Sequence, residues 1–462
     1  MPQPTSSTAK DQKPRSQELR APALGGPKAA GDTRSAAAFK GYVAGLNGGV
    51  GGTKASGPPG GPTGRGGPET NSVLDEDALD PVQARTTGPE MFINDNPETF
   101  RKPGVLGSTM APIPGRGDTT HTFTGSARFF ALAQNGTGHA LTQQLLIKNA
   151  GKTAQTFEVK GTVFANKGVT KTDGRIQQGY KRDGKFQGPQ AIAASSYLDA
   201  KPGSNGFLKK SVTVQAGSVG LLNAQYHECG AEVFILLEIT SSDPKGAFQL
   251  ANVATEKALD EKGRNAVASG KYQAAGDPAS DKDFASADGA KMGRPNGVIS
   301  AGSIVQGGRE IELKPGRRVG DLVMATDTRN SKGDKHEIAT IDQAMPNPKG
   351  RGTAATQNDG NYGMEYQLAY TLVNPTGQKL KVGVFLTAPK QRPGDELRPD
   401  GGAITMPVEI DGKRVEVRVN ARGVGVRLTE VEVGPNARRG MQLRWVHMGN
   451  TFPPAGVEFR AE

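Results

Sequence analysis

The sequence predicts an all-β protein: two tandem antiparallel β-sandwich modules, jelly-roll or Ig-like, behind a disordered N-terminal tail. The first observation is a repeated strand–turn–strand pattern, at residues 143–164 and again at 367–387. Its two turns begin at Asn149 and at Asn374. The second observation is that turn residues recur about every ten positions between apolar runs, as in sandwiches and barrels. We interpret both repeated patterns as hairpins.

A second parallel strengthens the prediction of two related modules. Residues 212–217 follow the first pattern, and the similar residues 431–435 follow the second, so the order of the two features is the same in both halves. Self-similarity of this kind is typical of a repeated structural unit. We therefore interpret the two halves as copies of one duplicated module.

The N-terminal region is predicted to be a tail. The chain has 462 residues with 64 Gly and 31 Pro, and residues 1–72 are rich in Gly, Pro and Ser with few apolar side chains. Such a composition cannot offset its ordering entropy. The formal net charge is +11, and basic residues outnumber acidic ones in this tail, which favours attraction to polyanions. Residues 73–118 are predicted to form an extended, ordered lead-in.

The first sandwich is predicted to span residues 119–255. Its run AEVFILLEIT is continuously apolar with Glu near its ends, which indicates a strand buried on both faces. The segment 166–206 interrupts this module, and we expect a short helix near 189–198 within it. Long segments of this kind are more often functional than accidental.

Residues 256–292 are predicted to be a polar connector with a short helix within 255–269. The second sandwich is predicted to span residues 293–462. Its clearest turn is Asp411-Gly412 between two alternating runs, a favoured two-residue hairpin turn.

Several functional classes lose their usual support in this sequence. Cys229 is the single cysteine, so no intrachain disulfide and no Cys-rich zinc site can form. We find no apolar run long enough to span a membrane, and no secretory signal peptide at the start. The usual phosphate-loop, hydrolase and zinc-protease motifs are missing, and few aromatic residues argue against specific nucleic-acid binding. We expect no cofactor.

Six residues are the candidate binding residues. Gly and Asn around residues 358–363 suit a tight turn, while amides beside Tyr362 could instead contact a sugar. The single tryptophan is predicted either to fill the core or a domain interface, or to serve as a stacking platform. The candidates are Asn358, Asp359, Asn361, Tyr362, Tyr180 and Trp445.

The remaining clusters point less clearly to chemistry, and the identity of any metal site is unknown. The sequence His227-Glu228-Cys229 is the densest reactive cluster, and we interpret it as a connection between two strands rather than as a site. A loose acidic series from Asp321 to Asp342 lacks the spacing of an EF-hand loop.

The chain also resembles an uncharacterised family, a domain of unknown function found mainly in cyanobacteria. The resemblance covers most of residues 90–460 and is carried by FINDNPET, GVLGST, FTGSARFFALAQN, GRPNGVISAGS and GNYGMEYQLAYTLVNPT. The family tends to have a pair of His where this chain has Ala133-Gln134, so a role of that pair is not carried over. Members are often exported, which implies the cell surface or the extracellular space. Because the resemblance extends across both copies and the connector, it implies that the copies are halves of one shared architecture. The functional surface is then expected at their junction and in the long polar segment 166–206.

From these observations we predict a non-catalytic bacterial cell-surface or extracellular-matrix protein that acts by macromolecular binding or self-assembly. A polysaccharide or another envelope protein would be its partner. One alternative is a carbohydrate-active or carbohydrate-binding protein with acidic residues on the sandwich loops, whose two carboxylates would face each other across a cleft at about 5–10 Å. Another is a polyanion binder that uses the basic tail.

Overall fold

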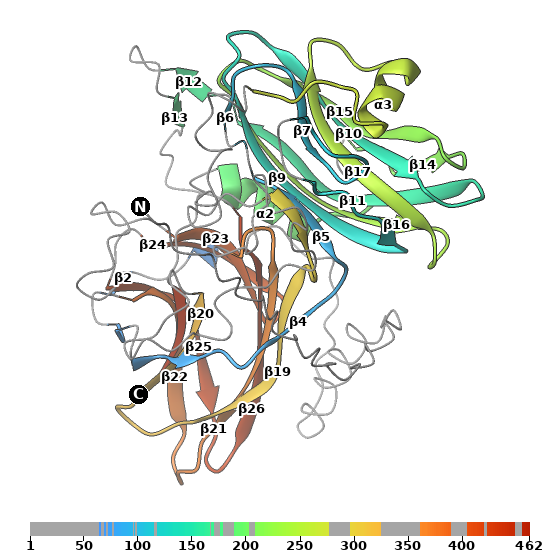
Figure 1. Cartoon of the computed structure of the whole chain (residues 1–462). Coiled ribbons are helices and arrows are strands. Elements are labelled where there is room, and N and C mark those ends of the chain that lie inside the picture. The colour runs from blue at the N-terminus through green and yellow to red at the C-terminus, as the bar shows by residue number, and fades with distance from the viewer. Residues whose placement is uncertain are drawn as a thin grey trace, which may run out of the picture.

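The structure is a computed structural model, and Figure 1 shows its course along the chain. It describes residues 64–65, 69–70, 73–75, 78–95, 97, 99–114, 118–166, 168–170, 176–178, 189–202, 208–276, 296–324, 361–389, 404–419, 423–448 and 455–462. The predicted tail lies almost wholly outside these residues.

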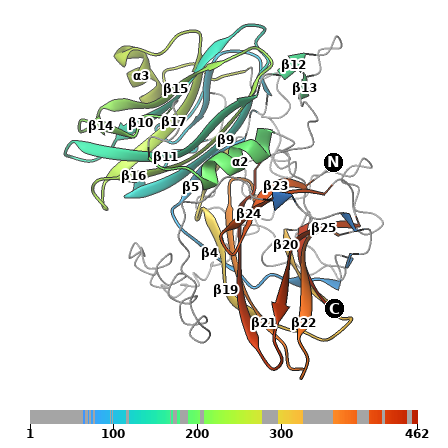
Figure 2. The same cartoon turned by 180° about the vertical axis from the view of Figure 1, so that it is seen from behind.

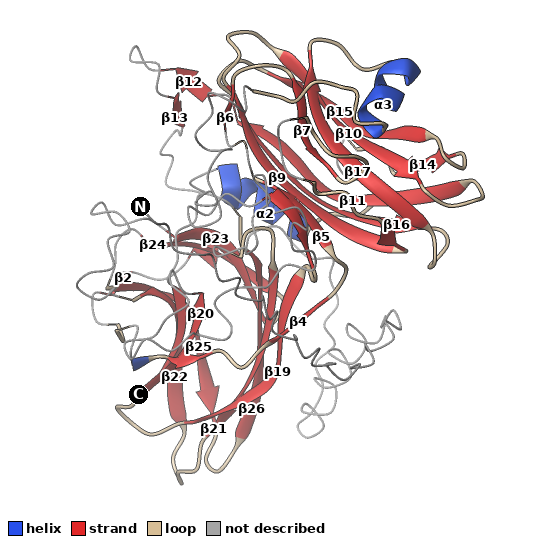
Figure 3. Ribbon diagram, viewed as in Figure 1, coloured by secondary structure: helices blue, strands red, loops and turns tan. Residues whose placement is uncertain are grey.

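The described chain forms two β-sandwiches, as the sequence predicts, with helix α2 (Pro189–Leu198) between them in both views (Figures 1 and 2). Figure 3 shows that strands make up nearly all of the regular structure. The helix coincides with the one expected in the segment 166–206. A second short helix, α3 (Glu261–Ala268), begins at Asp260, whose side chain accepts a hydrogen bond from the Gly263 amide.

The second sandwich has the strand order of a jelly roll. Its consecutive strands are β20 (Arg318–Met324), β21 (Glu365–Val373), β22 (Leu380–Ala388), β23 (Ile404–Ile410), β24 (Lys413–Val419), β25 (Val424–Val433), β26 (Arg438–Val446) and β27 (Ala455–Ala461). The first of these strands pairs with the last, the second with the seventh, and so on inwards to β23 and β24. One sheet contains β25-β22-β27-β20 and the other β24-β23-β26-β21. The chain is thus a long double-stranded ribbon wrapped into two sheets.

The first sandwich repeats most of this order. Its ribbon strands are β9 (Ser126–Asn135), β10 (Leu141–Asn149), β11 (Gln155–Asn166), β14 (Ser211–Val214), β15 (Val219–His227) and β16 (Glu232–Ser241). The pairs are β9 with β16, β10 with β15, and β11 with β14. The segment between β11 and β14, which holds α2 and the small pair β12 (Gly168–Thr170) and β13 (Ile176–Gln178), stands where the second sandwich has β23 and β24.

Further strands extend the four sheets. In the first sandwich these are β5 (Met91–Asn94), β6 (Thr99–Phe100), β7 (Gly104–Ser108), β8 (Phe123–Thr124), β17 (Ala247–Thr255) and β18 (Asn296–Ile299). In the second they are β1 (Gly64–Arg65), β2 (Glu69–Thr70), β3 (Asp80–Pro81), β4 (Arg85–Thr87) and β19 (Ser303–Glu312). The predicted lead-in therefore contributes strands to both sandwiches. Strand β18, inside the range predicted for the second module, pairs with β5 of the first.

Not every strand pair is antiparallel, in contrast to the prediction. Strand β19 runs parallel to β21, and β5 runs parallel to β9. Strands joined by a tight turn must be antiparallel, whereas strands added from outside the ribbon have no such constraint. The Asp411-Gly412 turn does join an antiparallel pair, β23 and β24, and both residues have positive φ as expected for a two-residue turn.

The prediction that the repeated patterns are hairpins is wrong. Strands β10 and β11 belong to different sheets, and so do β21 and β22. Asn149 and Asn374 therefore stand at corners where the chain passes from one sheet to the other. Sequence alone does not separate the two cases, because a hairpin turn and a sheet-to-sheet corner both need a short polar break between apolar strands.

The Asn149 side chain holds both strands of the ribbon at its corner. Its Nδ2 donates to the carbonyl oxygens of Thr153 at 2.8 Å and Val214 at 2.9 Å. Its Oδ1 accepts from the Gly151 amide at 2.9 Å. Because Val214 ends β14, the side chain joins the corner after β10 to the returning strand of the same ribbon. In the first half, the repeated pattern 143–164 and the similar segment 212–217 thus meet at one corner, on its two sides.

Asn374 makes the same bonds in the second sandwich. Its Nδ2 donates to the carbonyl oxygens of Gln378 at 2.7 Å and Val433 at 3.1 Å, and its Oδ1 accepts from the Thr376 amide at 3.0 Å. Asn135, at the corner between β9 and β10, repeats the pattern with the carbonyl of His227. All three asparagines are buried. They satisfy backbone groups that the bend removes from the ladders.

One sheet of the first sandwich contributes to two apolar cores, one on each of its faces. Strand β16 is buried on both faces, as the sequence predicts: Ile235 and Leu237 point into the first sandwich, whereas Phe234 and Leu236 belong to the cluster that fills the second. Tyr197 of α2 joins that second cluster. The halves therefore meet over a buried surface.

We expect Asn149→Ala to lower the free energy of unfolding by about 1–3 kcal/mol, because two carbonyls and one amide at a buried corner lose their partner. Unfolding in urea, followed by circular dichroism, measures this loss. The control is Thr153→Ala, which removes an exposed side chain and leaves the accepting carbonyl in place; it should change stability by less than about 0.5 kcal/mol. Equal effects of the two substitutions would contradict the role assigned to Asn149.

Candidate functional site

Three of the six candidate binding residues, Asn358, Asp359 and Tyr180, lie outside the described residues. Their positions are therefore not compared, and their role stays a prediction. The other three lie in the second sandwich, close to the ends of β21 and β26.

Asn361 and Tyr362 are buried just before β21. Asn361 has a positive φ of 51°, as the predicted tight turn requires, and its Nδ2 donates to the Tyr366 hydroxyl at 2.9 Å. The Tyr362 ring stacks on His447, with 5.2 Å between the ring centroids. Burial lowers the pKa of His447 to about 3, so this ring is neutral at physiological pH.

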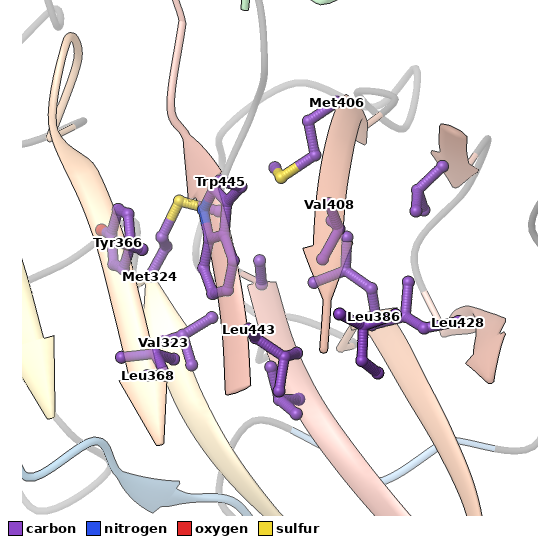
Figure 4. Packing of buried hydrophobic residues seen from close by; sticks show 14 of the residues in the cluster. Val323, Met324, Tyr366, Leu368, Leu386, Met406, Val408, Leu428, Leu443 and Trp445 are labelled. Carbon is purple, nitrogen blue, oxygen red and sulfur yellow. The ribbon is translucent and has the colours of Figure 1, made fainter. Parts of the chain in front are cut away.

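Trp445 fills the core. Its exposed fraction is 0%, and its indole stacks on Tyr366 with 4.8 Å between ring centroids (Figure 4). Met324 lies next to the indole in the same picture. Of the two roles considered for this tryptophan, its placement matches the core role, because no face of the ring is open to a sugar.

A row of charged side chains lies instead where the sandwiches meet. On the first sandwich, Lys160, Glu238 and Arg128 are directly opposite one another on β11, β16 and β9. The Glu238 carboxylate accepts from Lys160 Nζ at 2.5 Å and from Arg128 Nη2 at 3.0 Å. Arg128 is 2% exposed, and it also donates to the carbonyl oxygen of Gly302. This row belongs to the face of the sheet that is turned toward the second sandwich.

The second sandwich continues the row. Glu365, at the start of β21, accepts from Arg128 Nη2 at 3.0 Å and from Arg444 Nε at 2.7 Å. Glu409 then accepts from Arg444 at 3.1 Å and from Arg414 at 2.6 Å. These residues come from four neighbouring strands of one sheet, β21, β26, β23 and β24.

Helix α2 completes the arrangement. Arg414 Nη1 donates to Asp199, directly after the helix, at 2.6 Å, and to the Ser195 hydroxyl at 3.1 Å. We name the alternating series the junction chain. It consists of Lys160, Glu238, Arg128, Glu365, Arg444, Glu409, Arg414 and Asp199. Basic and acidic members alternate and balance in number.

Two carboxyl groups of the junction chain, those of Glu238 and Glu365, are kept ionised by their basic neighbours. Burial alone would raise the pKa of Glu238, but Arg128 and Lys160 outweigh it and lower the value to about 2. Burial likewise opposes ionisation of Glu365, and Arg128 and Arg444 lower its pKa below the ordinary range. Burial raises the pKa of Tyr197 well above 10, so its hydroxyl stays protonated and donates to Glu238 at 2.5 Å.

This electrostatic pattern is suited to holding the two sandwiches together rather than to acid–base catalysis. A glycosidase general acid must hold a proton near neutral pH, which requires a raised pKa. Glu238 and Glu365, which share Arg128, both have a lowered pKa instead. The chain can join two surfaces through charge-assisted hydrogen bonds.

Sequence reasoning named the junction as a candidate functional surface, which stays a prediction, and it did not select these residues. A signal was present: Arg128 lies within SARFFALAQN and Glu238 within VFILLEIT, both otherwise apolar strands. A charge in a strand buried on both faces requires a buried partner of opposite sign. Which residue supplies that partner depends on strands 110 and 237 positions away.

The remaining clusters form no metal site within the part of the chain that the structure describes. His227 ends β15 and bonds to the carbonyl of Ala231 at 2.8 Å, while Cys229 is exposed in the connection to β16. Of the acidic series, Asp321 lies in the described chain and pairs with Arg309. Within the described ranges, no three His, Cys, Asp or Glu residues are placed to hold a metal ion. The helices of these same ranges are too short or too polar to cross a membrane.

Comparisons with known proteins do not assign the chain to a family. No family model matches the chain, and no curated protein matches it. Among solved structures, the N-terminal CBM22-1-CBM22-2 tandem domain of Paenibacillus barcinonensis Xyn10C aligns at 9% identity with a TM-score of 0.15, over 78% of this chain and 90% of that one. The CUB1-EGF-CUB2 domain of human MASP-1/3 aligns at 10% identity with a TM-score of 0.15, over 72% of this chain and 99% of that one. The cryo-EM structure of T=1 Penaeus vannamei nodavirus aligns at 8% identity with a TM-score of 0.14, over 78% of this chain and 95% of that one. At these scores no property carries over.

Arg128→Ala should lower the unfolding midpoint of the second sandwich, although Arg128 belongs to the first. The substitution leaves Glu238 and Glu365 without a shared cation, and breaking one partner of a buried ion pair costs about 3–5 kcal/mol. Trp445 is the single tryptophan and is buried in the second sandwich, so its fluorescence in urea reports on that half alone. The control is Arg438→Ala, which removes an exposed pair with Glu310 and should change stability by less than about 1 kcal/mol. An unchanged Trp445 midpoint in the Arg128 variant would argue against coupling.

Stability should also fall in acid through Glu238. Its pKa is about 2 in the folded protein and 4.5 as the ordinary value, so the stabilisation is present above pH 4.5 and is lost as pH falls toward 2. Urea unfolding between pH 5 and pH 2 should show a smaller loss in Glu238→Gln than in the unaltered protein. Glu158→Gln, an exposed change on the neighbouring strand β11, serves as the control and should follow the unaltered protein.

Proposed function

We propose that this protein is a non-catalytic binding protein in which two jelly-roll-like sandwiches act as one rigid unit. It works at a bacterial cell surface or in an extracellular matrix, where it binds a polysaccharide or an envelope protein or associates with copies of itself. The observation that carries the proposal is the junction chain, whose buried members Arg128 and Glu365 connect the halves. A fixed pair of sandwiches presents two surfaces in one orientation, which favours extended partners over small substrates.

The carbohydrate-active alternative receives less support. The carboxylates brought together at the junction are Glu238 and Glu365, and basic groups hold both in the ionised form. Neither is suited to give a proton to a leaving group. A carbohydrate-binding role without catalysis remains within the proposal.

The location rests on the resemblance to exported proteins of an uncharacterised family, and it stays a prediction. The same is true of polyanion binding by the basic tail, because residues 1–72 lie almost entirely outside the described chain. Deletion of these residues separates that idea from binding by the sandwiches.

The test is co-sedimentation of the full chain with insoluble polysaccharides and with purified envelope fractions, compared with the variant that lacks residues 1–72. Light scattering over a concentration series measures self-association. We expect binding or association that survives removal of the tail. A strictly monomeric protein that sediments with none of these partners, and that fractionates with the cytoplasm, would overturn the proposal. Release of reducing sugar would contradict its non-catalytic part.

A further inference from the structure

Amide side chains line part of the interior of the first sandwich. Gln143 on β10 faces inward with the core residues Leu145 and Ile147, because alternate residues of a strand share a face. Gln225 on β15 is directly opposite Gln143, and Asn223 is directly opposite Leu145. The three amides therefore project into the space between the sheets.

Neighbouring strands extend this row. Gln143 Nε2 donates to Asn252 Oδ1 on β17 at 3.1 Å, and Asn252 Nδ2 donates to Asn94 Oδ1 on β5 at 2.8 Å. A Cβ atom at Gly107 would come within 2.7 Å of the Asn94 carboxamide, so this glycine leaves the space that Asn94 occupies. We name Asn94, Asn252, Gln143, Gln225 and Asn223 the amide row. Every member is at most 5% exposed.

One end of the amide row has unused hydrogen-bonding capacity. Neither the Oδ1 nor the Nδ2 of Asn223 has a partner, and the same is true of Gln225 Nε2 and Gln143 Oε1, counted over the described structure. A buried polar group without a partner costs about 1–3 kcal/mol. Such groups are rare in native proteins and require an explanation, such as a bound molecule.

The jelly-roll fold itself does not require these amides. Asn149 and Asn374 occupy equivalent corners, so residues at the same distance before them are counterparts. Leu368 is therefore the counterpart of Gln143. Its cross-strand partner Leu443 is the counterpart of Gln225. The counterpart of Asn223 is Met441 by the same register. The second sandwich thus builds its core at these positions from apolar side chains.

A local irregularity accompanies the amides. The register of β10 and β15 shifts between Leu145 and Leu146, so that Leu222 and Asn223 share one partner position. The equivalent pair, β21 and β26, runs in unbroken register. Bulges of this type often redirect a side chain next to a functional site. Here the bulge lies beside Asn223, which has the most unused capacity.

We propose that the amide row of the first sandwich binds a small, neutral, hydroxyl-rich molecule, such as a monosaccharide or a related polyol. The unused atoms of Gln143, Asn223 and Gln225 include both donors and acceptors, which matches hydroxyl groups because these donate and accept. The row carries no charge, which favours a neutral ligand over an ion. The inference deepens the proposed binding function and rests on it only for the class of ligand.

The experiment uses the full chain and a variant copied from the second sandwich, Gln143→Leu with Gln225→Leu. Native mass spectrometry of the purified protein detects a retained molecule. Calorimetric titration with glucose, galactose, N-acetylglucosamine, glycerol and inositol measures affinity. We expect at least one of these probes to bind, and the double variant to bind it more than about tenfold more weakly. Its urea midpoint should change little, because the loss of the hydrogen bond from Gln143 to Asn252 is offset by the removal of buried amide atoms that have no partner.

The matched control is Gln144→Leu. Gln144 is the next residue on β10 and faces the other way, where it bonds to Thr255 at 2.8 Å. This variant should keep the affinity of the unaltered protein, even if it is less stable. Equal affinity of the double variant and the unaltered protein would overturn the inference, as would a crystal structure with only water at the amides and no binding of any probe. Sedimentation with polysaccharide is scored separately, so either proposal can fail while the other stands.

Discussion

The architecture depends on moving two hydrogen-bonded strands together from one sheet to the other. A jelly roll is a wrapped ribbon, and each bend removes backbone groups from both strands at the same place. Asn135, Asn149 and Asn374 solve this with one side chain each, whose amide bonds to carbonyls on both sides of the corner. Where such corners stand, strand pairing can resume in the next sheet without buried, unpaired backbone groups. The core then forms between the sheets that the corners create.

The second constraint concerns how the sandwiches meet. Strand β16 is apolar on both faces, so its outer face must be covered, and α2 with the second sandwich covers it. The charges on that face, Arg128 and Glu238, would be costly in isolation. Their alternation with Glu365 and Arg444 of the second sandwich makes the burial tolerable and fixes one relative placement. Apolar area brings the halves together, and the junction chain selects the register in which they meet.

The two sandwiches use one strand order with different interiors. The second places Leu368 and Leu443 where the first places Gln143 and Gln225. Since the fold is satisfied by either set, folding alone does not require the polar set. The interior of the first sandwich is therefore where this chain departs from what the jelly roll needs.

The sequence by itself determined the all-β class, the two-part organisation, the helix at 189–198, the doubly buried strand β16 and the Asp411-Gly412 turn. These follow from local periodicity and turn chemistry, which act over a few residues. Only the tertiary structure decided that Asn149 and Asn374 lie at corners between sheets. A hairpin turn and a corner differ in which distant strand pairs with the strand after the turn. It also decided the burial of Trp445 and the partners of Arg128 and Gln143. Those outcomes depend on contacts between strands far apart in the chain, and a single sequence carries no local signal for such pairing.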